Sequence, residues 1–232
     1  MLCIAHRGAM GYAPENTLLS IQKAIDLGTD WIEIDVQLID KKLLVFHDRK
    51  LDRTTNGHGY IAHYTFAELR ELNAGLGQKI PTLDEVFQLI NGRVGLNIEL
   101  KEKGAALALA SYLSQLPHFI LHQDKLIISS FHMSELKKVK SFSPTFKIGV
   151  LAKKNKRAAF KWANKLKAYS IHFNLDAINK TTIDQAHQQG FQVYIYTVNE
   201  ITDILHMQEL GVDGVFCNFP DRALNLTITN FS

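Results

Sequence analysis

Glu33 and Asp35 lie in an alternating stretch that runs from Trp31 to Asp48. Every second residue in its first half is apolar, namely Ile32, Ile34, Val36 and Leu38. In a strand, successive side chains point to opposite faces, so the two carboxylates project together from the other face. Neighbouring carboxylates repel one another unless a cation or a proton relieves them, and a hard divalent metal prefers oxygen ligands. The pair predicts a metal site if that face is enclosed; the alternative is an edge strand with a solvated acidic face.

A second stretch repeats this pattern near residue 100. In VGLNIEL (94–100) and the residue after it, one face carries Leu96, Ile98 and Leu100, and the other carries Asn97, Glu99 and Lys101. Glu99 and Lys101 alone are also consistent with an ordinary ion pair on a sheet. Together, Glu33, Asp35 and Glu99 offer three acidic oxygens, which suit Mg²⁺ or Ca²⁺. No cysteine stands among them, which argues against structural zinc.

Basic and imidazole side chains follow the first two strand-like stretches. His6 and Arg7 follow the first, and His47 and Asp48 follow the second. Arg7 and Lys101 supply fixed positive charge for a phosphate, and the two histidines can exchange protons near neutral pH. Each residue alone has a structural interpretation, as a turn, a cap or a solvated side chain. Unpaired buried charge is costly, so their gathering in one enclosed interior would indicate a catalytic site.

Strand and helix patterns alternate along the whole chain and must position these residues. The expected strands are 2–5, 31–38 (resuming at 43–46), 94–100, 125–131, 146–151, 169–173, 191–198 and 212–217. The expected helices are 18–28, one that starts near Pro81, 104–116, 132–141, 154–167, 180–189 and 199–210. Such alternation favours a parallel sheet with right-handed crossovers. Eight units closing on themselves predict a TIM (β/α)8 barrel, with the site at the carboxyl ends of the strands. A doubly wound open sheet is the alternative.

The regular alternation is interrupted once, after the second strand. Residues 48–80 are irregular apart from a short helical piece around TFAELREL, and segments of this length are usually inserted or functional. No linker, low-complexity segment or further repeat divides the sequence. We therefore expect a single domain over residues 1–232, with an insertion at about 48–80.

Composition narrows the class of protein. The 232 residues are 46% hydrophobic and 21% charged, as in ordinary globular proteins, and the net charge of +3 gives no argument for nucleic-acid binding. Cys3 and Cys217 are too few for a disulfide framework, and we expect buried free thiols. No apolar run has the length of a transmembrane segment, and we expect no signal peptide within this sequence, since a strand is expected from residue 2. If Met1 is the natural start, a cytoplasmic location is expected. No oligomeric state is indicated.

An ordered set of motifs resembles the glycerophosphodiester phosphodiesterase family. These motifs are His6-Arg7-Gly8, Pro14-Glu15-Asn16-Thr17, Glu33-x-Asp35, His47-Asp48, Leu51-x-Arg53-Thr54-Thr55, Pro81-Thr82-Leu83-x-Glu85, Ile98-Glu99-Leu100-Lys101, Ser130-Phe131, Tyr196-Thr197-Val198-Asn199, Gly211-Val212-Asp213-Gly214-Val215 and Pro220. Each motif is weak alone, but the ordered set covers nearly the whole chain and is highly specific.

The resemblance implies a TIM barrel that hydrolyses small-molecule glycerophosphodiesters, such as glycerophosphocholine or glycerophosphoethanolamine, to sn-glycerol 3-phosphate and an alcohol. It also implies roles for particular residues: one divalent metal ion, Mg²⁺ or Ca²⁺, on Glu33, Asp35 and Glu99; acid–base catalysis by His6 and His47; substrate binding by Arg7, Lys101, Phe131 and Tyr196; and support by Glu15 and Asn16. The assignment of acid and base within the histidine pair stays open. The attacking group, water or the neighbouring glycerol hydroxyl through a cyclic phosphate, also stays open.

Two departures from the family pattern bear on substrate preference. The family usually has tryptophan where this chain has Tyr196, which we expect to form an apolar wall with a hydroxyl in reach. It usually has threonine and aspartate where this chain has Cys217 and Asn218. We expect neither change to touch the metal ligands or the histidines.

Two alternative functions remain on the same barrel. One is a phosphodiesterase that acts on lysophospholipids, as a lysophospholipase D does, and that has a wider or more apolar opening to the site. The other is a barrel that binds a phosphorylated ligand without turnover.

The basic segment 147–167 has no acidic residue. It is either a solvated helix face or, at its start near Lys153, a surface that attracts anionic substrate or lipid.

Overall fold

Eight parallel strands close into a barrel in the computed structural model, which describes residues 1–116 and 123–228. They are β1 (Leu2–His6), β2 (Trp31–Ile39), β4 (Gly95–Leu100), β5 (Leu126–Ser130), β6 (Lys147–Ala152), β7 (Ser170–Asn174), β8 (Gln192–Tyr196) and β9 (Gly214–Cys217). The first strand pairs in parallel with both β2 and β9, which closes the ring. The prediction of a TIM barrel is therefore confirmed, and the open doubly wound sheet is excluded.

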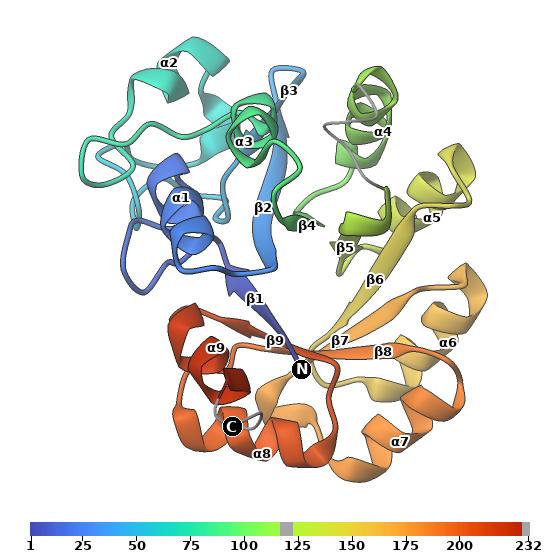
Figure 1. Ribbon diagram of the computed structural model, residues 1–232. Coiled ribbons are helices and arrows are strands. Elements are labelled where there is room, and N and C mark those ends of the chain that lie inside the picture. Colours follow the sequence, from blue (N-terminus) through green and yellow to red (C-terminus); the bar gives the residue numbers. More distant parts are fainter. Residues whose placement is uncertain (117–122, 229–232) are drawn as a thin grey trace.

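Helices surround the barrel (Figure 1). They are α1 (Leu18–Asp26), α3 (Leu83–Ile90), α4 (Ala105–Gln115), α5 (Met133–Phe142), α6 (Lys156–Leu166), α7 (Lys180–Gln188), α8 (Ile201–Leu210) and α9 (Pro220–Ile228). One continuous apolar core lies between these helices and the outer face of the strands. Outward-facing side chains of β2, such as Ile32 and Ile34, are fully buried in it. This packing leaves the alternate, polar side chains of the same strands to face the barrel interior.

Local capping signals fix where helices begin. Thr17 caps α1, and its hydroxyl accepts from the amide of Ser20. Thr82 caps α3 in a capping box with Glu85. These caps satisfy backbone amides that would otherwise lack partners at the helix ends. They hold the starts of α1 and α3 beside the loops that lead out of the barrel strands.

The segment after β2 forms a small insertion beside the barrel. It begins with β3 (Lys42–Val45), which pairs antiparallel with β2, and continues through a 3-10 turn (Ile61–His63) and α2 (Phe66–Glu71). A separate apolar cluster holds it together, made of Ile39, Leu44, Phe46, Leu51, Ile61, Leu69, Ala74 and Ile80. Since β2 and β3 contribute residues to this cluster, the insertion is anchored on the barrel strand that carries Glu33 and Asp35.

The two cysteines are buried free thiols, as expected. They lie on the neighbouring strands β1 and β9, where Ala5 pairs with Cys217 and Cys3 with Val215. Burial is the main cause that raises the pKa of each thiol, to about 11 for Cys217. Buried thiols with raised pKa values are poor nucleophiles, so neither cysteine is a candidate for covalent chemistry.

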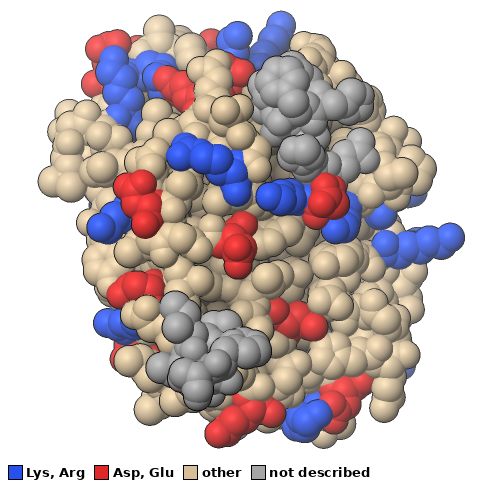
Figure 2. Space-filling model, viewed as in Figure 1, with Lys and Arg blue, Asp and Glu red and all other residues tan. Residues whose placement is uncertain are grey.

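The surface seen in Figure 2 carries charges of both signs in alternation, with no broad area of one sign. This face therefore lacks the concentrated positive charge that non-specific binding to nucleic acid requires. Across residues 1–116 and 123–228, no helix has the length and apolar character needed to cross a bilayer.

Candidate active site

Strand register brings three carboxylates together inside the barrel mouth. Glu33 pairs across β1–β2 with His6, and Asp35 pairs across β2–β4 with Glu99. One oxygen each from Glu33, Asp35 and Glu99 lies within 4.8 Å of the others. Glu33 and Asp35 are almost fully buried. The group of acidic residues predicted from the alternation is thus a compact set of hard oxygen donors.

Two cations border this acidic set. The Nζ atom of Lys101 lies 2.7 Å from Glu99 Oε1 and 3.2 Å from Asp35 Oδ1. The Nε atom of Arg7 lies 3.2 Å from Asp35 Oδ2, and its backbone amide donates to Glu33 Oε2 at 2.9 Å. Both side chains therefore present positive charge at the edge of the site, where a phosphate would meet it.

The carboxylates are held in different protonation environments. Burial, together with the charges of Asp35 and Glu99, raises the pKa of Glu33 well above its usual value. Burial and the charge of Asp35 likewise raise the pKa of Glu99 to about 7. Burial also opposes ionisation of Asp35, but Lys101 and Arg7 outweigh it and lower its pKa to about 2. Two of the three carboxylates thus lack enough positive charge around them to be readily ionised.

This donor set fits a hard divalent cation. It offers carboxylate oxygens alone, which suit Mg²⁺ or Ca²⁺ rather than a thiolate-bound metal. A cation held by Glu33, Asp35 and Glu99 would relieve the repulsion that raises the pKa values of Glu33 and Glu99.

His6 faces the acidic set from the end of β1. Its Nε2 atom lies 4.0 Å from Glu33 Oε2, and its Nδ1 atom lies 2.8 Å from Asn218 Oδ1. Burial and the charge of Arg7 lower the pKa of His6 to about 4. The ring is therefore neutral at pH 7. If Nδ1 carries the proton and donates it to Asn218, the lone pair of Nε2 is free to accept a proton.

His47 stands on the insertion side of the same mouth. Its Nδ1 atom lies 2.5 Å from Asp48 Oδ1, and Asp48 Oδ2 in turn accepts from Arg53 Nε at 2.6 Å. Burial lowers the pKa of His47, although the charge of Asp35 and the hydrogen bond to Asp48 act in the opposite direction. A carboxylate therefore orients this imidazole, whereas an amide orients His6.

Glu15 and Asn16 support the site from the loop after β1. Glu15 accepts from Arg7 Nη1 at 2.7 Å and from both Nη atoms of Arg53 at 2.6 and 2.7 Å. Asn16 donates to Asp35 Oδ2 at 2.9 Å, and its Oδ1 accepts from the Asp35 amide at 3.1 Å. These contacts fix the positions of Arg7 and Asp35.

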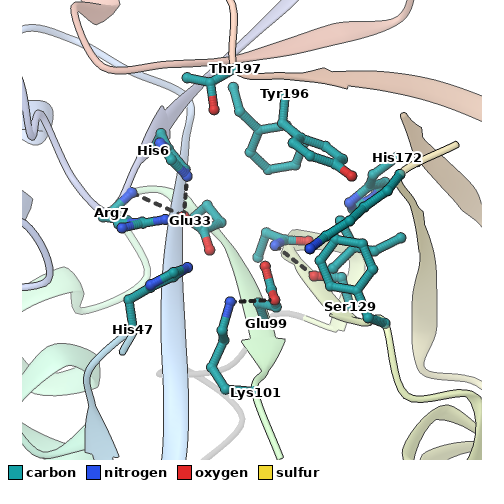
Figure 3. Close-up of a pocket in the computed structure, with 15 residues that line it drawn as sticks. His6, Arg7, Glu33, His47, Glu99, Lys101, Ser129, His172, Tyr196 and Thr197 are labelled. Carbon is teal, nitrogen blue, oxygen red and sulfur yellow. Dashed lines mark hydrogen bonds and ion pairs between the residues drawn. The ribbon is translucent and has the colours of Figure 1, made fainter. Parts of the chain in front are cut away.

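A cavity of about 300 Å³ opens beside these charged groups. Its lining includes the charged and imidazole side chains of His6, Arg7, Glu33, His47, Glu99 and Lys101, and also Phe131, Leu151, Lys153, His172, Tyr196, Thr197 and Phe216. Figure 3 shows the labelled side chains converging on this space from both sides. Phe131 and Tyr196 meet edge to face at 6.2 Å, and the Tyr196 hydroxyl donates to Ala152 O at 2.9 Å.

All residues predicted for the site lie at this mouth, with one expectation overturned. We expected the change to Cys217 and Asn218 to leave the histidines untouched, and this was wrong, because Asn218 Oδ1 contacts His6 Nδ1 directly. The role of Arg53 was also not predicted, although it stands in one of the recognised motifs. Its contacts to Glu15 and Asp48 depend on how the insertion folds back, which no local pattern reveals.

Comparison with known proteins agrees with this geometry. Residues 6–222 match the model of the glycerophosphoryl diester phosphodiesterase family. A glycerophosphodiester phosphodiesterase of Caldanaerobacter subterraneus subsp. tengcongensis is 36% identical over 97% of each chain. One from Bacillus altitudinis is 33% identical over 96% of each chain. The structure of an Oleispira antarctica phosphodiesterase in complex with the product sn-glycerol-3-phosphate superposes with a TM-score of 0.91, at 31% identity over 98% of this chain and 97% of that one.

Proposed function

This chain belongs to the glycerophosphoryl diester phosphodiesterase family, and from that premise we propose the substrate, the metal and the residue roles that give it its activity. It is a phosphodiesterase. The proposed reaction is metal-dependent hydrolysis of glycerophosphodiesters, including glycerophosphocholine and glycerophosphoethanolamine, to sn-glycerol 3-phosphate and an alcohol. The observation that carries the proposal is the set of three carboxylate oxygens within 4.8 Å of one another, flanked by two histidines. The product in the Oleispira antarctica complex agrees with the same reaction.

Glu33, Asp35 and Glu99 would hold one divalent ion, Mg²⁺ or Ca²⁺. When bound, such an ion supplies Lewis-acid stabilisation of the phosphate oxygens. Arg7 and Lys101 add fixed positive charge at the rim of the site and orient the diester. Because both cations already lie against Asp35, they are positioned before the substrate arrives.

His6 is proposed as the general base and His47 as the general acid. The pKa of His6 is about 4, since burial and Arg7 disfavour its charged form, so the ring is free to accept a proton at neutral pH. Burial lowers the pKa of His47, and Lys101 and Arg7 act in the same direction; Asp35 by charge and Asp48 by a hydrogen bond act against them and favour the protonated form that an acid needs. The base takes the proton of the attacking hydroxyl, and the acid protonates the leaving alkoxide. Either water or the adjacent glycerol hydroxyl serves as the attacking group in this scheme.

We also propose that residues 1–232 act as a single catalytic domain with an insertion at about 48–80. The continuous core around the barrel and the anchoring of the insertion on β2 and β3 support this proposal. A cytoplasmic location stays a prediction from the sequence.

The test is release of glycerol 3-phosphate from glycerophosphocholine, measured with a coupled assay. The protein is first treated with EDTA and then supplied with Mg²⁺ or Ca²⁺. We expect turnover that EDTA abolishes and one of the ions restores. Glu99→Gln should lower kcat by about 100-fold or more, because it removes one charged metal ligand.

The matched control is Glu209→Gln, since Glu209 is exposed on α8, away from the pocket lining. Turnover that persists fully in EDTA would contradict metal dependence. If the folded protein released product only from lysophospholipid, the substrate class would have to be revised. If it bound glycerol 3-phosphate but released product from neither substrate, it would be a binding barrel.

A further inference from the structure

The cavity has few carboxylates in its lining. Among the described residues that line it, the carboxylates are Glu33 and Glu99. Both belong to the proposed metal site, and Glu99 also pairs with Lys101. No lining carboxylate is therefore left to receive a cationic part of a substrate, such as a choline or ethanolamine head group.

Lys153 adds a third cation to the lining, besides Arg7 and Lys101. It follows β6 and leads into α6, and its side chain is exposed at the mouth. Among the described residues, no carboxylate lies within ion-pair distance of its ammonium, in contrast to Lys101. The charge of Lys153 is thus unneutralised by protein and faces whatever enters the cavity.

The ammonium of Lys153 also contacts an aromatic ring of the cavity lining. Its Nζ atom lies 5.4 Å from the centroid of the Phe131 ring, within the usual range of a cation–π contact. Choline groups in proteins commonly bind against the faces of aromatic rings. The Phe131 ring is thus already paired with a cation of the protein.

We propose that Lys153 is a head-group-selecting residue, which disfavours glycerophosphodiesters with cationic head groups relative to neutral or anionic ones. This inference rests on the proposed function and narrows its substrate class. Glycerophosphocholine remains a substrate, but like charge from Lys153 and the occupied Phe131 face weaken its transition-state binding. A neutral polyol or an anionic head group meets an ammonium donor instead of a repelling charge.

The experiment compares glycerophosphocholine with its uncharged isostere, the diester of 3,3-dimethylbutanol, which replaces the quaternary nitrogen by carbon. The two leaving alcohols differ in acidity, so the absolute rates are not compared. The test is the ratio of kcat/KM for glycerophosphocholine to kcat/KM for the isostere, and how that ratio differs between a variant and the wild type. In Lys153→Met, we expect the ratio of kcat/KM for glycerophosphocholine to that for the isostere to rise about three- to tenfold. The rise is modest because the charge that is removed is exposed to solvent. Lys153→Glu should shift it further in the same direction.

The matched control is Lys154→Met, which changes an exposed lysine outside the cavity lining and should keep the wild-type ratio. In the wild type, the ratio should also move towards choline as salt is raised, since salt screens exposed charges. An equal change of both kcat/KM values in Lys153→Met, or no change in either, would overturn the selection. Absence of glycerol 3-phosphate from both substrates in the wild type would contradict the proposed function itself.

Discussion

The imidazole of His6 is oriented by an amide, that of Asn218. The backbone amide of Asn218 donates to Asn199 Oδ1 at 2.8 Å, so the position is held independently of its side chain. A carboxylate there would favour the protonated imidazole, whereas the present amide accepts a hydrogen bond without adding charge. Burial and the charge of Arg7 lower the pKa of His6 to about 4, against the hydrogen bond to Asn218 and the charge of Asp35.

Asn218→Asp should therefore raise the pKa of His6. A base must be neutral to act, so a higher pKa moves the acidic limb of the pH profile of kcat/KM to higher pH. We expect a shift of about one pH unit or more, the usual effect of an opposite charge at hydrogen-bond distance. The measurement is kcat/KM between pH 4 and pH 8.

Asn218→Leu is the companion variant, since it removes the hydrogen bond and adds no charge. It should lower kcat/KM by about tenfold across the profile, because the imidazole loses its orientation. An acidic limb that stays in place in Asn218→Asp would show that His6 is not the group whose ionisation limits the reaction.

Residue types and spacing were enough to identify the polar groups at this site but not their partners. Alternation placed Glu33 and Asp35 on one face, and the same pattern placed Glu99 on the matching face of a neighbouring strand. Parallel register then made Asp35 and Glu99 direct neighbours. The contact between His6 and Asn218 joins residues 212 positions apart, and it arises only when the barrel closes. No pattern confined to one strand predicts such a pair.

At the scale of elements, the insertion contacts the residues around the site through one side chain, that of Arg53. Arg53 donates to Glu15 with both Nη atoms and to Asp48 with Nε. Glu15 also accepts from Arg7, and Asp48 is hydrogen-bonded to His47. The insertion thus connects a phosphate-facing cation with one of the two proposed proton-transfer groups.

Arg53→Ala should lower kcat/KM by about 10- to 100-fold, because both Glu15 and Asp48 lose a partner that fixes them. The free energy of unfolding should change by less than about 1 kcal/mol, since the guanidinium is half exposed. Arg53→Lys should not restore activity, because an ammonium cannot reproduce the planar fork. Kinetics and chemical denaturation of the same preparations provide both values.

Arg49→Ala is the matched control, because Arg49 is an exposed arginine in the same loop. It should leave both quantities unchanged. If Arg53→Ala lost activity and stability in parallel, the residue would be maintaining the fold of the insertion instead of positioning the site.

Element order was predictable from the sequence because each strand and helix has its own period, and the eight-fold alternation led directly to the barrel. The interior of the insertion was less predictable. Its antiparallel β3 and the cluster around Leu51 and Leu69 depend on contacts between short pieces that lack a steady period. Their arrangement depends on packing against β2 and on contacts with the loop after β1, such as Arg53 with Glu15.

At the scale of the whole molecule, the barrel interior contains a histidine that the proposed reaction does not use. His172 of β7 is fully buried and stacks between Tyr194 and Phe216, each at 5.2 Å. Its Nε2 atom bonds Ser170 Oγ at 2.8 Å, and its Nδ1 atom has no hydrogen-bond partner among the described residues. Gly149 leaves room for the ring, because a Cβ there would lie 2.5 Å from Nε2.

Burial lowers the pKa of His172 to about 3, from about 6.5 in the unfolded chain. Between these values the unfolded state binds a proton that the folded state does not. The contribution of neutral His172 to the free energy of unfolding is therefore fully present above about pH 6.5. Below that pH it falls by about 1.4 kcal/mol per pH unit. His6, with a pKa of about 4, adds a second contribution of the same sign.

His172→Gln should reduce the slope of unfolding free energy against pH between pH 6 and pH 4, because it removes one of these two proton-binding sites while keeping a polar group near Ser170. Urea denaturation at half-unit pH intervals gives the slope. The variant is expected to be less stable than the wild type at pH 7, since glutamine cannot stack between the two rings, and this difference should narrow by about 1.4 kcal/mol per unit as the pH falls. His206→Gln, on the exposed face of α8, should run parallel to the wild type. A variant curve at position 172 that is also parallel to the wild type would mean that the closed barrel admits a proton to this ring, and that its interior is less isolated from solvent than its packing indicates.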